Sequence, residues 1–238
     1  MVKSAEENLR PIEFRGDLIN GEFLRSEAYD FSWTVSSPAD LNDEVIHPEA
    51  HVSHVERACL AAKAAYRGWA LRPFDERKEC LLRLKEVYLS RSQELAQVIS
   101  RETGKPLWEA QSEAKAMASK IDVTVNHSMD LVRDQKVDNA LAQVDGYVRF
   151  KPRGVMAVIG PFNFPGHLPN GHIIPALATG NTVVFKPSDK TPGVGQLMAE
   201  MFVEAEFPEG VFNLVQGPGD LSRKLCENEH VDGILFTG

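Results

Sequence analysis

The sequence predicts an α/β fold, a Rossmann-like parallel sheet with flanking helices that follows an N-terminal helical and β element. Short strands and helical segments alternate regularly from residue 154 to the end of the chain. These strands are almost continuously apolar, which is typical of parallel strands whose sheet is covered on both faces. The 238 residues, of which 43% are hydrophobic and 25% charged, are enough for one large domain or two small ones, with an ordinary globular composition.

The first residues predict a small β element in front of the helices. Residues 1–14 are polar, and we expect them to be loosely ordered. The segment 17–24 predicts a short hairpin, because Asn20-Gly21 is a favoured two-residue turn. A further strand is expected over 31–35, before the loop 36–39. We expect this β element to lie against the main body of the protein.

Helices are predicted after the β element, because apolar residues recur there at spacings of three and four. Arg72-Pro73 ends the first helix, and Asp75 is a candidate N-cap for the second. Gly104, followed by Pro106, predicts the end of the next helix. A further helix is expected over 107–134. Each helix has one apolar stripe, so each must pack on another element.

The last part of the chain supplies the strands of the predicted sheet. A first strand is expected over 141–150, and a turn at 151–154 leads into the next strand. Right-handed crossovers between parallel strands place all of their carboxyl ends along one edge of the sheet. The strands expected in this sheet are 155–159, 182–185, 211–215 and 233–236, separated by helices at 168–178, at 192–205 and up to about residue 227.

Candidate site residues follow these strands directly. In open α/β sheets, ligands bind outside the carboxyl ends of the strands. An amide held at that edge can donate a hydrogen bond to an oxygen that gains negative charge. A lysine and a carboxylate there can bond to ribose hydroxyls or phosphate. The candidates are Gly160, Pro161, Phe162, Asn163, Lys186, Pro187, Ser188, Asp189, Gly217, Thr237 and Gly238.

Each candidate also has a purely structural explanation. Asn163 fits a turn residue held by its own side chain, and Lys186 fits a strand-end charge that reaches solvent. Asp189 fits the N-cap of the following helix. The dinucleotide fingerprint Gly-x-Gly-x-x-Gly follows none of the strands. Their joint position on one sheet edge favours a binding site, in which the amide of Asn163 and the ammonium of Lys186 converge on a shared crevice.

Composition argues against several other classes of protein. The net charge is −8 and no basic stripe is present, so we expect no nucleic-acid partner. No apolar run is long enough to span a bilayer and no secretory signal opens the chain, so we expect no association with a membrane and a cytoplasmic location.

The cysteines and histidines do not predict a metal site. Cys59, Cys80 and Cys226 are widely spaced, which favours small buried hydrophobic residues over metal ligands. His51 and His54 lack a third ligand at helical spacing, which favours solvated or capping side chains.

Four motifs occur in order along the second half of the chain. They are Pro161-Phe-Asn-Phe-Pro165, Pro175-Ala-Leu-Ala-Thr-Gly-Asn-Thr-Val-Val-Phe-Lys-Pro-Ser188, Pro208-Glu-Gly-Val-Phe-Asn-Leu-Val-Gln-Gly217 and Phe236-Thr-Gly238. Their order and spacing resemble those of the NAD(P)-dependent aldehyde dehydrogenase superfamily, and the segments 19–23 and 102–106 (Glu-Thr-Gly-Lys-Pro) also fit. Within the superfamily, Pro165-Gly-His-Leu-Pro-Asn-Gly-His172 is similar to the N-succinylglutamate 5-semialdehyde dehydrogenases of arginine breakdown.

The resemblance implies a role for each site residue. Asn163 matches the amide that stabilises the oxyanion of the thiohemiacetal. Lys186 and Asp189 match the pair that holds the adenosine ribose, and Ser188, between them in sequence, is expected to be a further cofactor-binding residue. Gly217 matches a position near the adenine. The remaining implied cofactor-binding residues are Ile159, Gly160, Pro161 and Phe162, which line the cofactor, and Phe236, Thr237 and Gly238, which lead into the pyrophosphate-binding helix start.

The resemblance also implies the domain organisation. Residues 1–140 form the N-terminal helical part of the cofactor-binding domain, 141–153 the hairpin that joins subunits, and 154–238 a truncated Rossmann-like core. The family's nucleophilic cysteine and general-base glutamate lie beyond Gly238, so the catalytic domain is absent and we expect no dehydrogenase activity from this chain alone. NAD is the expected cofactor, with NADP as the alternative, because Asp189 replaces the usual, longer glutamate.

We therefore expect the N-terminal, cofactor-binding part of an aldehyde dehydrogenase, which acts on a small aldehyde only in a complete enzyme. The alternative is a stand-alone nucleotide-binding or assembly module without catalysis. Self-association, or pairing with a complementary catalytic half, is expected in either case. The reason is that the last strand has no following helix and the hairpin has no partner, which leaves apolar surface open.

Overall fold

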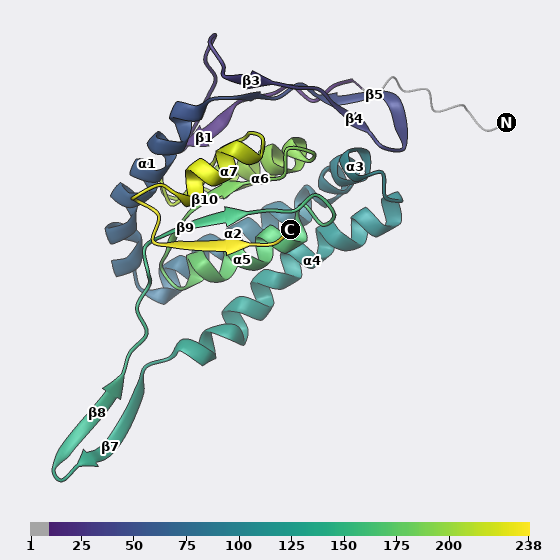
Figure 1. Cartoon of the computed structure of the whole chain (residues 1–238). Helices are drawn as coiled ribbons and strands as arrows, with labels where there is room; N and C mark the ends of the chain where they lie inside the picture. Colours follow the sequence, from purple (N-terminus) through teal and green to yellow (C-terminus); the bar gives the residue numbers. More distant parts are fainter. Residues whose placement is uncertain (1–9) are drawn as a thin grey trace.

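A six-stranded sheet lies at the centre of the protein, whose residues 10–238 are described by a computed structural model (Figure 1). The strand order is β12-β9-β10-β11-β1-β2. The first four strands in this order run parallel to one another. They are β9 (Val155–Ile159), β10 (Thr182–Lys186), β11 (Phe212–Leu214) and β12 (Gly233–Phe236). The predicted α/β fold with a parallel sheet is confirmed.

The N-terminal hairpin extends this sheet instead of lying against it. β1 (Asp17–Ile19) and β2 (Glu22–Leu24) pair antiparallel around Asn20-Gly21, as the sequence predicts. β1 also pairs antiparallel with β11, so that Leu18 lies opposite Leu214. All of the β1 residues are buried, which explains why this short strand joins the sheet.

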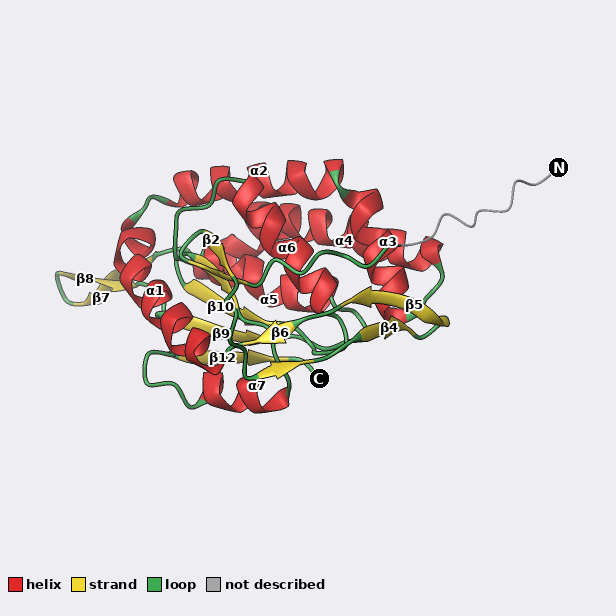
Figure 2. Ribbon diagram, turned by 90° about the horizontal axis from the view of Figure 1, so that it is seen from above, coloured by secondary structure: helices red, strands yellow, loops and turns green. Residues whose placement is uncertain are grey.

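Helices cover the sheet on both faces (Figure 2). Buried residues of β9 and β10 alternate between two hydrophobic clusters, so each strand meets a helical layer on either side. α1 (Val52–Leu71) and α7 (Gly219–Cys226) contribute to the smaller cluster. The larger cluster contains residues of α2 (Phe74–Ser90), α3 (Ser92–Thr103), α4 (Leu107–Asn126), α5 (His167–Ala178) and α6 (Pro192–Glu204).

The helix ends follow most of the sequence signals. Gly104 ends α3 in the left-handed conformation, with a φ of 72° that glycine adopts at little cost. Asp75 does not cap α2, because the N-cap is Pro73 and no side chain bonds there, so this prediction was wrong. Asp75 lies in the first turn, where a negative charge interacts favourably with the helix dipole. Within residues 10–238, no helix combines the length and apolar character needed to cross a bilayer.

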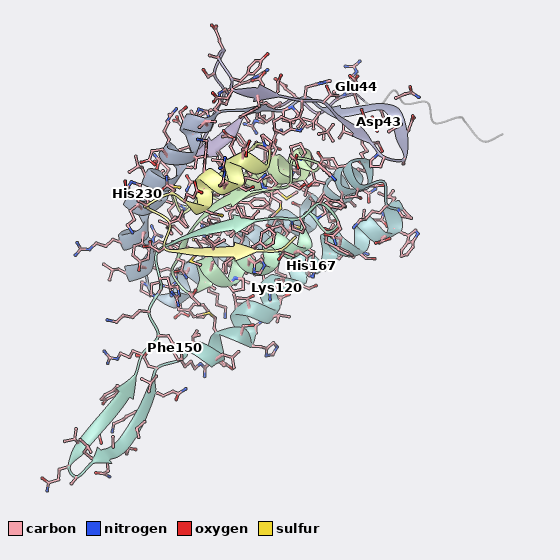
Figure 3. The ribbon with its side chains drawn as sticks, in the orientation of Figure 1. Asp43, Glu44, Lys120, Phe150, His167 and His230 are labelled. Atoms are coloured by element: carbon pink, nitrogen blue, oxygen red, sulfur yellow. The ribbon has the colours of Figure 1, made fainter. Side chains whose placement is uncertain are left out.

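A long hairpin projects from the body of the protein (Figure 1), and Phe150 lies at its root (Figure 3). It consists of β7 (Gln135–Leu141) and β8 (Val144–Val148), which pair antiparallel. The prediction of a single strand over 141–150 was therefore wrong, and the hairpin begins before the expected boundary at residue 141. Every residue of β7 is exposed, so no burial pattern marks this strand in the sequence.

The segment before the hairpin also differs from its prediction. The helix expected over 107–134 ends at Asn126, and the short 3-10 helix η1 (Ser128–Val132) follows it. No residue of η1 is buried. The helix was predicted to continue to Asp134 because polar residues occur on the exposed face of a helix as well as in exposed non-helical segments, so the sequence does not distinguish the two.

Two small antiparallel pairs complete the N-terminal region. β3 (Phe31–Ser32) pairs with β6 (Glu49–Ala50), and β4 (Val35–Ser37) pairs with β5 (Asp40–Ile46). The strand predicted over 31–35 is thus divided between β3 and β4.

The prediction of loosely ordered residues covered 1–14, of which 1–9 lie outside the described residues. Ile12 forms a bridge with Ile46, and the side chain of Phe14 is buried. For the segment 10–14 the prediction was therefore wrong, because two apolar side chains in this polar stretch pack on β4 and β5.

A buried polar cluster joins α1 to the sheet. His51 and His54 are both buried, so the predicted solvated position was wrong, whereas His51 does occupy the N-cap position of α1, without a side-chain capping bond. Nδ1 of His54 lies 2.7 Å from Oδ2 of Asp17, and Oδ1 of Asp17 accepts a hydrogen bond from the backbone N of Gln216 at 2.6 Å. Burial raises the pKa of Asp17, and the bond to His54 opposes this change. The cluster therefore ties α1 and β1 to the end of β11.

Candidate functional site

The ends of β9, β10 and β12 lie at the same level of the sheet. Ile159 is in register with Lys186 on one side and with Phe236 on the other. The backbone N of Gly160 donates to the carbonyl of Lys186 at 3.0 Å, and the N of Thr237 donates to that of Ile159 at 3.2 Å. Candidate residues from three separate parts of the sequence therefore meet along one edge.

Lys186 is buried at this edge, with 3% of its surface exposed. Its Nζ donates to the carbonyls of Pro187 at 2.6 Å and Gly217 at 2.7 Å, which joins the ends of β10 and β11. Burial lowers the pKa of Lys186 to about 8, and the charge of Asp189 opposes this change. The suggestion that Lys186 is a strand-end charge reaching solvent was therefore wrong.

Asn163 lies on the exposed loop between β9 and α5. Its Oδ1 accepts from the backbone N of Phe164 at 3.1 Å, which is the local turn contact that a structural asparagine makes. Its Nδ2 makes no hydrogen bond within residues 10–238, so this donor is available to a ligand. No hydrogen bond joins the side chains of Asn163 and Lys186 in the described part of the chain, and the ammonium of Lys186 is buried. Their convergence on one crevice stays a prediction.

The segment after β10 presents several polar groups. Oγ of Ser188 accepts from the backbone N of Lys190 at 3.2 Å and lies 3.4 Å from the carboxylate of Asp189. Asp189 is exposed, and its carbonyl accepts from Nε1 of Trp33 at 2.8 Å. Nζ of Lys190 lies 4.6 Å from the ring centroid of Phe162, which links this segment to the loop after β9. Asp189 therefore presents its carboxylate to solvent at the edge of the site.

Asp189 does not cap the following helix, so that structural explanation was wrong. The N-cap of α6 is Thr191, whose side chain makes no capping bond. A hollow of about 530 Å³ lies beside Asp189 and Phe162. Its other side is formed by Trp33, by residues of β4 and by Glu102 and Thr103 at the end of α3.

Two glycines of the site are explained by close packing. A Cβ at Gly217 would lie 2.4 Å from Cδ2 of Leu221, so a side chain there would force Leu221 of α7 to shift away from the end of β11. A Cβ at Gly160 would lie 2.7 Å from Cγ of Pro169 and 3.1 Å from the ring of Phe185. Both glycines hold elements close together at the edge where the strands end.

The last residues of the chain contact α5. Nε2 of His172 and Oγ1 of Thr237 are 2.8 Å apart. Burial lowers the pKa of His172, and the charge of Lys120 adds to this effect. Phe236 is 67% exposed, which leaves an open apolar surface on β12.

Cys59 and Cys226 do not carry reactive thiolates. Cys59 and Cys80 are buried, as predicted, and Cys226 is half-buried. Burial raises the pKa of Cys59 to about 12 and also raises the pKa of Cys226. A thiol with a raised pKa is protonated at neutral pH and is a weak nucleophile.

Three charged residues near the site were missed from sequence. Glu102, Lys105 and Glu113 bond to the backbone of the loops that follow β9 and β10. Glu102 and Lys105 belong to the motif noted at 102–106, which was the available signal. Their partners lie far away in the sequence, so spacing alone does not identify them.

Comparison with known proteins agrees with this geometry. A family model described as the aldehyde dehydrogenase family matches residues 25–238. The N-succinylglutamate 5-semialdehyde dehydrogenase of Burkholderia vietnamiensis (strain G4 / LMG 22486) is 46% identical over 189 residues, which cover 79% of this chain and 38% of that protein. The protein of the same name from Vibrio cholerae serotype O1 (strain ATCC 39315 / El Tor Inaba N16961) is 46% identical over 184 residues, covering 77% of this chain. The chain spans only 38% of the length of these relatives.

Solved structures show the same fold. The NAD-dependent aldehyde dehydrogenase from Sinorhizobium meliloti superimposes with a TM-score of 0.90 and 28% identity, over 97% of this chain and 46% of that one. The NADP-dependent glyceraldehyde-3-phosphate dehydrogenase from Bacillus halodurans C-125, complexed with NADP, gives a TM-score of 0.86 and 32% identity, over 93% of this chain and 48% of that one. The resemblance found in the motifs is confirmed, and the chain belongs to the aldehyde dehydrogenase family.

Proposed function

We propose that this chain is the cofactor-binding part of an aldehyde dehydrogenase that oxidises N-succinylglutamate 5-semialdehyde to the acid with NAD, or with NADP. The observation that carries the proposal is the meeting of three strand ends at one edge, with Lys186 bonded across to Gly217. The substrate is proposed from the names of the two bacterial relatives at 46% identity. The reaction belongs to arginine breakdown if the substrate is correct.

The residues at this edge fit a dinucleotide. The ammonium of Lys186 has three N–H donors, and two of them bond to the carbonyls of Pro187 and Gly217. The third N–H donor remains for a ribose hydroxyl. The exposed carboxylate of Asp189 can accept from a second hydroxyl, and Ser188 lies beside it. When bound, the nicotinamide cofactor accepts a hydride from the substrate. The other proposed cofactor contacts are Ile159, Gly160, Pro161, Phe162, Gly217, Phe236, Thr237 and Gly238.

Asn163 is the proposed catalytic residue of this chain. Its free Nδ2 can donate to the aldehyde oxygen as negative charge develops there, which is worth about 10²–10³ in rate for one such donor. Among the cysteines of residues 10–238, none fits the nucleophile: burial keeps Cys59 protonated and raises the pKa of Cys226, and Cys80 is buried. We therefore propose that the chain is inactive alone and needs a nucleophile and a general base from another polypeptide segment.

Dinucleotide binding tests the first part of the proposal. Titration of the chain with NAD, and separately with NADP, is followed by isothermal calorimetry. We expect saturable micromolar binding that Asp189→Ala weakens, with a stronger effect for the preferred cofactor. Glu229→Ala, an exposed carboxylate after α7, is the matched control and leaves the affinity unchanged. Absence of binding for both dinucleotides contradicts the proposal.

Complementation tests the second part. The chain is mixed with a second polypeptide, which consists of the part of the Vibrio cholerae protein that this chain does not match. NADH formation from N-succinylglutamate 5-semialdehyde is then measured. Activity that appears only in the mixture, and falls about 10²-fold or more with Asn163→Ala, supports the proposed role. Binding without any recovered activity favours the alternative, a stand-alone nucleotide-binding or assembly module.

The projecting hairpin favours self-association in either case. Its exposed apolar side chains have no cover within residues 10–238, and apolar surface of this kind marks contact sites. Sedimentation velocity is expected to show association that Tyr147→Asp reduces, because the charge would lie in the apolar patch. A wild-type chain that stays monomeric at high concentration contradicts this part. The exposed apolar residues are Val137, Leu141, Val144, Tyr147, Val148 and Phe150.

A further inference from the structure

Lys105 is bonded to the loop that carries Asn163. Its Nζ donates to the carbonyl of Asn163 at 2.8 Å and lies 4.0 Å from the ring centroid of Phe164. The same ammonium is 2.8 Å from Oε2 of Glu113, which is buried on α4. Lys105 therefore connects the backbone of the proposed donor to a charge inside the helical layer.

Glu113 holds the next part of the same loop. Its Oε1 accepts from the backbone N of Gly166 at 3.0 Å and from that of His167 at 3.1 Å. A Cβ at Gly166 would lie 2.6 Å from Sδ of Met117, so the loop sits directly against α4. One buried carboxylate thus satisfies two N–H groups at the start of α5, which otherwise have no helical partners.

Glu102 does the same for the segment after β10. Its two oxygens accept from the backbone N of Gly193 at 2.7 Å and of Val194 at 2.8 Å, in the first turn of α6. Thr191, the N-cap residue, provides no side-chain bond of its own. A Cβ at Gly193 would lie 2.9 Å from Oε1 of Glu102, so a side chain there would displace the carboxylate.

The turn between α3 and α4 fixes these groups relative to one another. Gly104 adopts the left-handed conformation, with its N bonded to the carbonyl of Ser100. Oγ of Ser100 donates to the carbonyl of Lys105 at 2.8 Å. The turn is therefore held by its own hydrogen bonds, and Glu102 and Lys105 extend from one rigid piece of backbone.

We propose that the segment 102–113 positions both halves of the active site: the Lys105–Glu113 pair holds the loop bearing Asn163, and Glu102 holds the segment that follows Asp189. The significance for catalysis rests on the proposed function of those two residues. A displacement of about 1 Å at a catalytic group costs about 10²-fold in rate, so a fixed backbone at Asn163 has a direct effect on chemistry. Lys105, Glu113 and Glu102 act through other residues and are positioning residues.

Hydrogen exchange of the backbone amides tests the proposal on this chain alone. Lys105→Met is expected to raise the exchange rates of Gly166 and His167 about tenfold and to leave those of Gly193 and Val194 unchanged. Glu102→Gln is expected to do the reverse, because the amide nitrogen that replaces one oxygen cannot accept from Val194. Lys85→Met is the matched control: it removes an ion pair of Lys85 with Asp122 on the same helical layer and changes neither segment.

Other outcomes of the exchange experiment are equally decisive. If either variant raises exchange in both segments equally, or in neither, the two-sided positioning is overturned. Should Lys105→Met fail to fold, Glu113→Gln provides the same test, because it keeps the size of the side chain and one acceptor oxygen. Lys105→Arg retains the charge and is expected to restore at least part of the protection.

The complemented enzyme gives a separate, functional readout. We expect Lys105→Met to lower kcat about 10-fold to 100-fold with little change in NAD affinity, and Glu102→Gln mainly to weaken NAD affinity. Equal effects of both variants on kcat and affinity contradict the division of roles. If the chain binds no dinucleotide, the proposed function is contradicted. The hydrogen-exchange experiment still tests the positioning of the two segments, because it needs no bound cofactor.

Discussion

Replacement of Lys186 by methionine tests whether its ammonium is buried as the structure shows. Lys186→Met removes the charge and shortens the side chain by only one atom. The variant loses the hydrogen bonds to the carbonyls of Pro187 and Gly217 and at the same time removes the cost of burying an ammonium. These effects oppose each other at neutral pH. The difference in unfolding free energy at one pH is therefore uninformative, whereas its dependence on pH is not.

The pKa of Lys186 gives the size and sign of that dependence. Its folded value of about 8 lies below the ordinary 10.5, so between these values the unfolded chain binds more protons than the folded one. The free energy of unfolding therefore rises with pH through this window, and the full burial cost is present below it. At about 1.4 kcal/mol for each pH unit, the cost amounts to about 3 kcal/mol.

Urea denaturation of the wild type and the variant at several pH values between about 7 and 10 measures this effect. The wild type is expected to gain about 2–3 kcal/mol relative to Lys186→Met over that range. Lys190→Met, which removes an exposed ammonium of the same segment, is the control and is expected to show no such change. A constant difference between wild type and Lys186→Met across the range would refute the burial of a charged Lys186.

Two further predictions concern other buried polar groups. Tyr88→Phe removes the hydrogen bond from the Tyr88 hydroxyl to Oδ1 of Asn170 inside the core, and is expected to lower the unfolding free energy by about 1–3 kcal/mol. Tyr66 is half-buried and donates to the carbonyl of Pro152, so Tyr66→Phe is expected to lower the unfolding free energy by less. Equal losses for the two variants in urea denaturation would contradict this prediction. Burial raises the pKa of Glu102 from 4.5 to about 8, so the folded state holds its proton more tightly and the wild type is expected to lose a few kcal/mol relative to Glu102→Gln as pH rises through that window. A difference between wild type and Glu102→Gln that stays constant between these values would show that the carboxylate is ionised throughout and would contradict the prediction.

The parallel strands could be predicted because their signals are local. β12 begins and ends where the sequence predicts, and β10 is longer than predicted only by the inclusion of Lys186. Continuous apolar runs bounded by glycine and proline are sufficient to recognise such strands. Since parallel strands share one edge, the location of the strand-end residues followed from the same reasoning.

Features that depend on distant partners could not be predicted. β7 is exposed along its whole length and is recognisable only from its pairing with β8. The buried contact of His54 with Asp17 joins two segments that have no common pattern. Burial of a charge likewise depends on the groups packed around it, so the position of Lys186 between two carbonyls could not be read from its neighbours in sequence.

The pairing of β1 with β11 has a consequence for how the protein forms in the cell. Asp17 and Gln216, which bond across this junction, are separated by 199 positions, so synthesis must proceed at least to Gln216 before β1 can pair with β11. Until then the β1–β2 ribbon presents Leu18 and an unpaired edge, both of which attract other chains. Folding that waits for contacts at such distance is slow, so this ribbon is exposed to aggregation for longer than one whose strand partners lie nearby in sequence.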